Sequence, residues 1–339
     1  MHPFFRNMRH RATVVIGSLA ILALASLVFS GMIGSVSIPL ADMPGALAEL
    51  AHGSNGSLAA TLLELRISRA LVAFVTGSAL ALAGVMMQAL LRNPLADPYV
   101  LGISAGASVG ALAALLVMGA LWVIDAAAFA GAVAVSMMLY LFARRDLRGG
   151  AEGGTSQLLL TGVILSSLCM AMVTLMLSIA PESRLRSMIF WMIGDLAGAP
   201  LRAVPWVVLA AGLLFALRSA RALNVLSLHA EAAATLGIRV GALRKGLFFC
   251  SALLTASAVT SAGSIGFVGL IVPHACRFAC GPDHRLLIPA AALAGGTFLV
   301  LADTLARTVL APQQLPVGVV TALIGAPVFL YQLHRLRRA

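Results

Sequence analysis

Two overlapping G-x-S-x-G strings, at residues 102–106 and 106–110, come closest in this sequence to a nucleophile motif. Such a motif exposes a reactive serine only where a strand leads into the turn that carries it. Here both strings lie in one apolar stretch of helical character, and their glycines recur at every fourth position. Small residues at that spacing let helices approach closely. We therefore expect Ser104 and Ser108 to support helix packing rather than catalysis.

A second group combines residue types that can bind metals, namely His274, Cys276, Cys280 and His284. His274 and Cys276 are two positions apart, so they do not share a helical face cleanly with Cys280. Two packed cysteines flanked by interfacial histidines explain the pattern, and we predict no metal site here. The 14 methionines are likewise expected to be packing residues rather than ligands of a soft metal.

The sequence also lacks the phosphate-binding motif G-x-x-x-x-G-K-[ST], so we do not expect this chain to hydrolyse ATP or to be an enzyme. Carboxylates deep in an apolar span often mark a path for ions or protons. Asp195 and Asp303 fall near the ends of apolar segments, and no acidic residue lies clearly at the middle of one. An ion-coupled secondary transporter is therefore the less favoured alternative.

Arginines at the ends of apolar segments are the remaining candidates for chemistry. Arg66 and Arg69 are three positions apart, so they share a helical face. Arg307 ends a later segment on the same predicted side. These side chains could extend toward lipid headgroups, or they could form a positive rim for an acidic partner. Arg184 and Arg186 could likewise contact either an anionic substrate or lipid headgroups.

The scaffold that positions these residues is predicted to be an all-α integral membrane protein. Hydrophobic residues make up 60% of the 339 positions and charged residues only 10%, far below the charged fraction of a soluble domain. A membrane-spanning helix needs about 20 apolar residues. We predict ten spans within a single domain, at residues 13–33, 70–91, 100–120, 122–143, 157–180, 203–220, 245–262, 264–280, 286–306 and 316–334.

The formal charge of +11 is explained by topology rather than by nucleic acid. With ten spans and both termini in the cytoplasm, most basic residues fall in cytoplasmic gaps, as the positive-inside rule requires. Six fall on the far side: Arg66, Arg69, Arg184, Arg186, Arg202 and Arg307.

Three segments between spans are expected to carry structure of their own. Residues 34–64 are predicted to form an extracytoplasmic loop with one amphipathic helix. Residues 222–244 form a cytoplasmic segment in which a short helix ends at Gly237. Residues 183–196 follow Pro181 and are predicted to form a half-helix on the far side. A broken span is tolerated only beside protein or a water-filled cavity, so this break indicates a pathway wall.

Many short motifs along the chain resemble one family, the membrane subunits of ATP-binding-cassette importers for ferric siderophores, haem and cobalamin. The resemblance runs over almost the whole chain after Glu64. The matching strings are LRISR at 65–69, GVMMQ at 84–88, NPLADP at 93–98, LGISAGA at 101–107, WMIGDL at 191–196, GFVGLIVPH at 266–274, ADTLAR at 302–307, LPVGVVT at 315–321 and GAP at 325–327.

The resemblance implies a ten-helix subunit of a bacterial inner membrane that dimerises with a second copy of itself around a central pathway. Two cytoplasmic ATP-binding subunits would hydrolyse ATP, so this chain would bind no cofactor of its own. A periplasmic substrate-binding protein would deliver a metal chelate. By the same resemblance, Arg66, Arg69 and Arg307 match arginines that pair with acidic residues of the binding protein.

Two further groups of residues are expected to have roles, the first by the resemblance and the second because the fifth span is broken. Residues 222–244 would contain the short coupling helices that contact the ATPase, with contacts expected at Leu228, Glu231, Ala232, Leu236 and Gly237. Relatives commonly carry Gly-Glu-Glu and a basic residue in this stretch, which this chain lacks, so its contacts would rely more on shape than on ion pairs. The broken fifth span would gate the pathway, with candidates Met172, Met176, Arg184, Arg186 and Met188.

Overall fold

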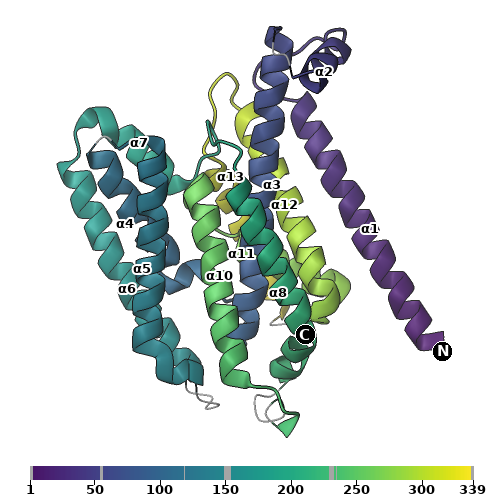
Figure 1. Cartoon of the computed structure of the whole chain (residues 1–339), viewed down its shortest axis with the longest axis vertical. Coiled ribbons are helices and arrows are strands. Elements are labelled where there is room, and N and C mark those ends of the chain that lie inside the picture. Colours follow the sequence, from purple (N-terminus) through teal and green to yellow (C-terminus); the bar gives the residue numbers. More distant parts are fainter. Residues whose placement is uncertain are drawn as a thin grey trace.

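The computed structural model describes residues 3–53, 56–117, 119–148, 154–228, 233 and 235–336, and every regular element in these residues is a helix (Figure 1). The helices are α1 (Pro3–Met32), α2 (Met43–Ala51), α3 (Leu58–Leu91), η1 (Pro98–Leu101), α4 (Ile103–Leu116), α5 (Leu121–Arg148), α6 (Gly154–Ile179), α7 (Glu182–Ile193), α8 (Ala203–Leu228), α10 (Val240–Ala262), α11 (Val268–Cys280), α12 (His284–Thr308) and α13 (Val317–Leu336).

The predicted all-helical, multi-pass architecture is confirmed. In the described part of the chain, seven helices are long and apolar enough to cross a membrane, and α4, α11 and α13 are shorter apolar helices. Each of the ten predicted segments coincides with one of these helices. The 14 residues of α4 rise only about 21 Å at 1.5 Å per residue, short of the roughly 30 Å hydrocarbon core.

Helix α3 runs through the middle of the molecule, with α8, α10, α11 and α12 beside it (Figure 1). From Val72 to Leu91 almost all of its side chains are buried, Leu80 and Met86 completely so. Two glycines permit this packing. A Cβ at Gly77 would overlap the carbonyl oxygen of Gly295 on α12, and a Cβ at Gly84 would overlap the carbonyl of Gly269 on α11. Close helix contacts of this kind replace the hydrophobic driving force that is missing in lipid.

A second group of helices, α4 to α7, lies beside this bundle (Figure 1). The expected packing role of the G-x-S-x-G glycines is confirmed here. A Cβ at Gly106 would lie 2.6 Å from the carbonyl oxygen of Gly131 on α5. Ser104 donates a 2.8 Å hydrogen bond to Ser264, and Ser108 donates to the carbonyl of Ser104 at 3.1 Å. Both serines thus connect helices or turns of helix.

The loop predicted at residues 34–64 contains the expected short helix, α2, but it ends earlier than predicted because α3 begins at Leu58. The early start has a local cause. Ser57 caps α3 by accepting a 3.1 Å hydrogen bond from the amide of Ala60. The carboxylate of Glu49 accepts hydrogen bonds from both the amide and the hydroxyl of Ser57. These bonds lower the pKa of Glu49.

The segment predicted at residues 222–244 is also shorter than expected, because α8 continues to Leu228 and α10 begins at Val240. Asn224 fixes the extra turns of α8 against the start of α12. Its amide nitrogen donates to Asp283 at 2.7 Å, and its amide oxygen accepts from the backbone of His284 at 2.9 Å. Burial acts to raise the pKa of Asp283, but hydrogen bonds from Arg285 and Asn224 outweigh it and hold the pKa below its usual value.

Candidate functional site

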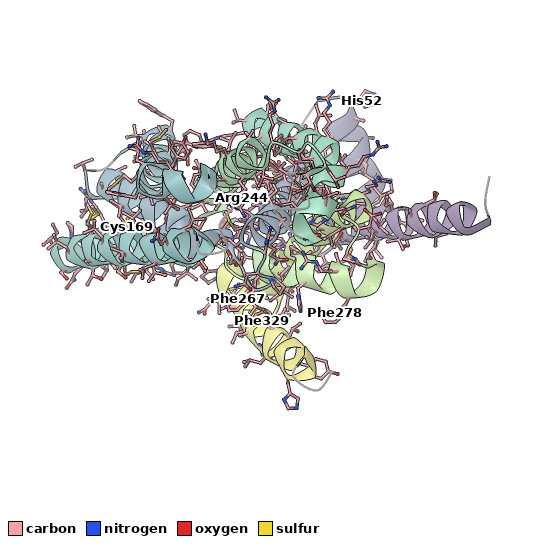
Figure 2. The ribbon with its side chains drawn as sticks, turned by 90° about the horizontal axis from the view of Figure 1, so that it is seen from below. His52, Cys169, Arg244, Phe267, Phe278 and Phe329 are labelled. Atoms are coloured by element: carbon pink, nitrogen blue, oxygen red, sulfur yellow. The ribbon has the colours of Figure 1, made fainter. Side chains whose placement is uncertain are left out.

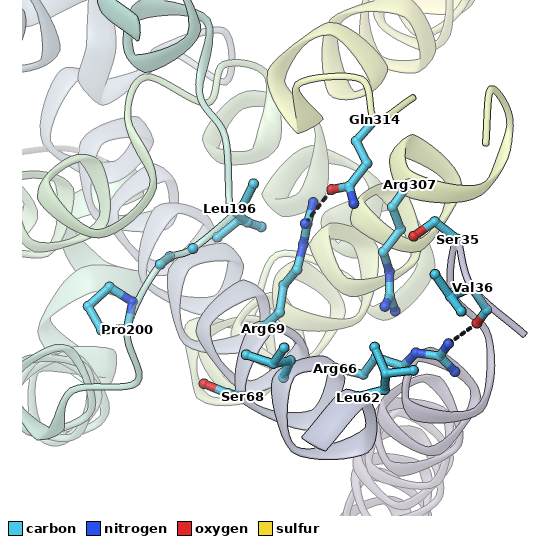
Figure 3. Close-up of a pocket in the computed structure, with 15 residues that line it drawn as sticks. Ser35, Val36, Leu62, Arg66, Ser68, Arg69, Leu196, Pro200, Arg307 and Gln314 are labelled. Atoms are coloured by element: carbon cyan, nitrogen blue, oxygen red, sulfur yellow. Dashed lines mark hydrogen bonds between the residues drawn. The ribbon is translucent and has the colours of Figure 1, made fainter. Parts of the chain in front are cut away.

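The three arginines predicted to form a positive rim line one pocket of about 470 Å³ (Figure 3). The start of α3 and the end of α1, beside the pocket, lie at the end of the bundle opposite the termini (Figure 1). Arg66 and Arg69 lie within the third and fourth turns of α3, deeper along the helix than predicted because α3 starts early. Arg307 comes from the last turn of α12. The pocket is completed by residues 34–36, residues 196–200 and Gln314.

Arg69 forms a buried ion pair with Asp303 that joins α3 to α12. Its Nε lies 3.0 Å from both carboxylate oxygens, and its Nη2 lies 2.8 Å from Oδ1. The Asp303 side chain is only 1% exposed. The remaining guanidinium nitrogen, Nη1, donates to Gln314 at 2.7 Å, a bond visible in Figure 3. A forked pair of this kind fixes the orientation as well as the charge of the arginine.

Arg66 and Arg307 both bind the end of α1. Arg66 donates to the carbonyl oxygens of Met32, at 2.9 Å, and of Val36 (Figure 3). Arg307 donates to the carbonyl and hydroxyl of Ser30 at 2.5 and 2.6 Å. The last carbonyls of a helix are otherwise unpaired and carry partial negative charge. The two arginines therefore cap α1, whose apolar stretch is mostly exposed and which projects from the bundle in Figure 2.

The pocket is strongly positive. It holds three guanidinium groups, and two of them lie near Asp303: Arg69 Nη2 lies 2.8 Å from its Oδ1, and Arg307 Nε lies 3.7 Å from its Oδ2. Asp195 approaches only to 4.0 Å of Arg69. The arrangement can hold an acidic group from another molecule, and it can do so only while the arginines are kept in place by Asp303 and the end of α1.

Asp303 and the α1 carbonyls are site components that the sequence interpretation missed. One signal was available, since Asp303 and Arg307 are four positions apart and share a helical face. The carbonyl oxygens of α1 could not be predicted from residue types, because every residue has a backbone carbonyl.

The half-helix predicted at residues 183–196 is confirmed as α7, which ends where Gly194 adopts a positive φ of 89°. Of the gate candidates on or near it, Met188 is fully buried, and Arg184 donates to the carbonyl of Leu116 at the end of α4. Arg186 is exposed and lies over the ring of Phe190, 5.4 Å from its centroid.

Two further gate candidates lie on α6. Met172 is 42% exposed, and Met176 is partly buried against the core. The structure therefore does not bring the gate candidates together into one lining, and their role stays a prediction.

The coupling candidates lie at the opposite end, beyond α8. Leu228 is the last residue of α8, whereas Glu231 and Ala232 lie outside the described residues. Leu236 is 69% exposed, and Gly237 has a positive φ of 79°. The amide of Ile238 donates to the carbonyl of Ala233 at 3.0 Å, which is the bond expected after a glycine helix stop.

The metal-ligating types at residues 274–284 lie on α11 and at the start of α12. His274 and Cys276 are buried. Within the described ranges, no three histidine, cysteine or acidic side chains are grouped so that they could hold a metal ion.

Comparison with known proteins gives a consistent result across sequence and structure. The model of the FecCD transport family matches residues 21–335. The chain is 38% identical over 343 residues to the vitamin B12 import system permease protein BtuC of Citrobacter koseri, covering 100% of this chain and 99% of that protein. It is 42% identical over 275 residues to the cobalamin import system permease protein BtuC of Halobacterium salinarum, covering 80% and 72%.

A solved structure described as a metal-chelate type ABC transporter in an inward-facing conformation shares the fold. Its TM-score is 0.81 at 30% identity, over 95% of this chain and 99% of that one. The family match spans far more than half of the sequence, and the Citrobacter koseri relative is 38% identical over nearly the whole of both chains. This chain is a multi-pass membrane protein that belongs to the FecCD transport family.

Proposed function

We propose that this chain is the permease subunit of an ATP-driven importer that moves a metal chelate across a bacterial inner membrane, with a cobalamin as the first candidate. The observation that carries the proposal is the end-to-end match to a protein named as a vitamin B12 import permease. The wider set of ferric siderophores, haem and cobalamin follows from the family resemblance. The alternative, an ion-coupled secondary transporter, has no such support.

In the assembly we propose, ten helices cross the membrane, and the chain pairs with a second copy around the pathway. Exposed apolar side chains on α6, among them Ile164, Leu168 and Leu175, are available for that contact. The end that carries both termini would face the cytoplasm, as the distribution of basic residues favours. Two ATP-binding subunits would dock at that end on the segment around Leu236, and their cycle would drive alternating access.

At the opposite end, the arginine pocket would receive the periplasmic binding protein. Arg66, Arg69 and Arg307 present guanidinium groups around a 470 Å³ hollow, which suits one acidic side chain per permease copy. Electrostatic complementarity of this kind speeds docking and fixes its register.

The function is tested by reconstituting the full chain with its ATPase in liposomes and measuring uptake of cobalamin delivered by the binding protein. We expect uptake that needs ATP and that survives collapse of the proton gradient. Uptake that stops when the gradient collapses, in the presence of ATP, would instead establish the secondary transporter.

The docking role predicts a salt-dependent loss of affinity in the variants Arg66→Gln and Arg307→Gln. Binding of the binding protein to the permease complex should weaken about tenfold at low ionic strength. The difference should shrink at high salt, where the Debye length falls to about 3 Å and the attraction between the arginines and an acidic group approaching through solvent is screened. Isothermal titration at several salt concentrations measures the effect.

A matched control is Arg221→Gln, which removes one exposed charge from α8, near the end that carries the termini. Its affinity should equal that of the unchanged protein at every salt concentration. If Arg66→Gln and Arg307→Gln bind as Arg221→Gln does at low salt, while remaining folded, the two arginines only cap α1.

A further inference from the structure

A second basic pocket, of about 320 Å³, lies at the end of the bundle that carries the termini, and neither the family match nor the proposed function assigns it a role. Four helices meet there. The end of α3 contributes Gln88 and Arg92, the end of α8 contributes Ser227, α11 contributes Arg277, and the start of α12 contributes His284.

Several polar atoms of this pocket are buried without a partner in the described part of the chain. They are Nε and Nη2 of Arg92 and Nε2 of His284. His284 is only 3% exposed, and its Nδ1 donates to the amide oxygen of Asn224 at 2.8 Å, so Nε2 of the neutral ring is an acceptor. Buried polar groups are nearly always hydrogen-bonded. The two unsatisfied guanidinium donors of Arg92 therefore indicate a missing acceptor.

The charge of the pocket indicates which acceptor is missing. Among the described lining residues there is no carboxylate, while Arg92 and Arg277 are cationic. Arg277 donates to the neutral amide of Gln88 at 3.1 Å. Asp283 lies next to His284 in sequence, but its carboxylate already accepts bonds from Asn224 and from the backbone of Arg285. These bonds leave the cluster without an anion to balance it.

The backbone at Arg92 supports a binding role. Arg92 ends α3 with φ 47° and ψ 34°, in the left-handed region. Residues other than glycine adopt this region uncommonly, and strained conformations concentrate at functional sites. At this position the helix stops, and Arg92 lines the pocket together with Arg277 and His284.

We propose that Arg92 and Arg277 bind a phosphate group. A guanidinium group donates two parallel hydrogen bonds to phosphate oxygens, and Nε2 of His284 on α12 can accept a hydrogen bond from a protonated phosphate oxygen. The phosphate can come from free inorganic phosphate or from the headgroup of an anionic lipid, because basic pockets between membrane helices bind such headgroups. The bound group would connect the ends of α3, α11 and α12.

The proposal is tested on the full chain in neutral detergent by following thermal unfolding. The probes are inorganic phosphate and soluble dihexanoyl phosphatidylglycerol, each against chloride or dihexanoyl phosphatidylcholine at equal ionic strength. We expect at least one phosphate probe to raise the unfolding temperature in a saturable way. Stabilisation by inorganic phosphate indicates a free anion, and stabilisation by phosphatidylglycerol alone indicates a headgroup.

The variants Arg92→Gln and Arg277→Gln should weaken the apparent affinity for that probe about tenfold or more. The matched control is Arg285→Gln, which removes an exposed charge next to His284 but outside the pocket. It should bind the probe as the unchanged chain does. If Arg277→Gln fails to fold because Gln88 loses its donor, Arg92→Gln carries the comparison.

Two results would overturn the site. One is an unfolding temperature that neither phosphate probe raises above its control. The other is equal affinity in Arg92→Gln and Arg285→Gln. If neither probe binds, and the pocket variants alone lose association with the ATPase, the cluster is a protein contact rather than a phosphate site. This test does not use the transported substrate, so its outcome is independent of the proposed function.

Discussion

Asp303→Asn is expected to lower the free energy of unfolding by about 3–5 kcal/mol, the range for removing one partner of a buried ion pair. The carboxylate is 1% exposed and balances the Arg69 guanidinium, whose side chain is 12% exposed. An asparagine keeps the shape but leaves Arg69 and Arg307 as neighbouring cations, with only the more exposed carboxylate of Asp195 at 4.0 Å from Arg69. Thermal unfolding of the detergent-solubilised chain, together with its yield, measures the loss.

The chain supplies a matched control in Asp125→Asn. Asp125 also pairs with an arginine, Arg202, but those side chains are 20% and 38% exposed. Exposed ion pairs contribute about 0–1 kcal/mol, so this variant should unfold close to the unchanged protein. Equal losses from Asp125→Asn and Asp303→Asn would mean that the Arg69 pair is not held in a low-dielectric site.

Apolar length and short polar interruptions were sufficient to predict the helices. All ten predicted segments are helical, and the breaks at Pro181 and Gly194 fall where the sequence placed them. The start of α3 and the end of α8 were harder to predict, because those helices extend beyond the apolar stretch. Ser57, which is bound by Glu49, caps the start of α3, and Asn224 binds the end of α8 to the start of α12.

Part of the arginine pocket was also predictable. The spacing of Arg66 and Arg69 placed them on one face, and the resemblance added Arg307. The partners of these arginines were not predictable from local pattern. Arg69 and Asp303 are 234 positions apart, and the acceptors of Arg66 are backbone carbonyls.

The second basic pocket was missed for another physical reason. Its arginines, Arg92 and Arg277, were explained by the positive-inside rule, which accounts for charge by location and does not ask what each cation contacts. Only the helix packing brings Gln88, Arg277 and His284 together. Both basic pockets therefore depend on how α3 and α12 are paired.

Helices α3 and α12 contribute to both pockets. Arg69 and Asp303 lie at one end of this pair, and Arg92 and His284 lie at the other. Between the ends, Gly77 and Gly295 allow the backbones to touch. Because both helices are packed closely and continuously, a displacement at the glycine contact should move both ends at once.

Gly77→Ala is therefore expected to destabilise the chain by about 1–3 kcal/mol and to reduce transport together with binding-protein affinity. The new Cβ would overlap the Gly295 carbonyl and lie 2.7 Å from Cβ of Leu299, and neither atom can turn aside as a flexible side chain would. Thermal unfolding and uptake by reconstituted liposomes measure the two effects.

Gly17→Ala is the matched control, since it adds the same methyl group to α1 where no atom lies within 4 Å. Alanine is also the better helix former, so this variant should be as stable as the unchanged chain or more so. If Gly77→Ala behaves as Gly17→Ala does in both measurements, the α3 and α12 backbones are not in contact in the working protein. The two pockets would then have to be positioned by separate means, the arginine pocket by Asp303 and the basic pocket by Asn224.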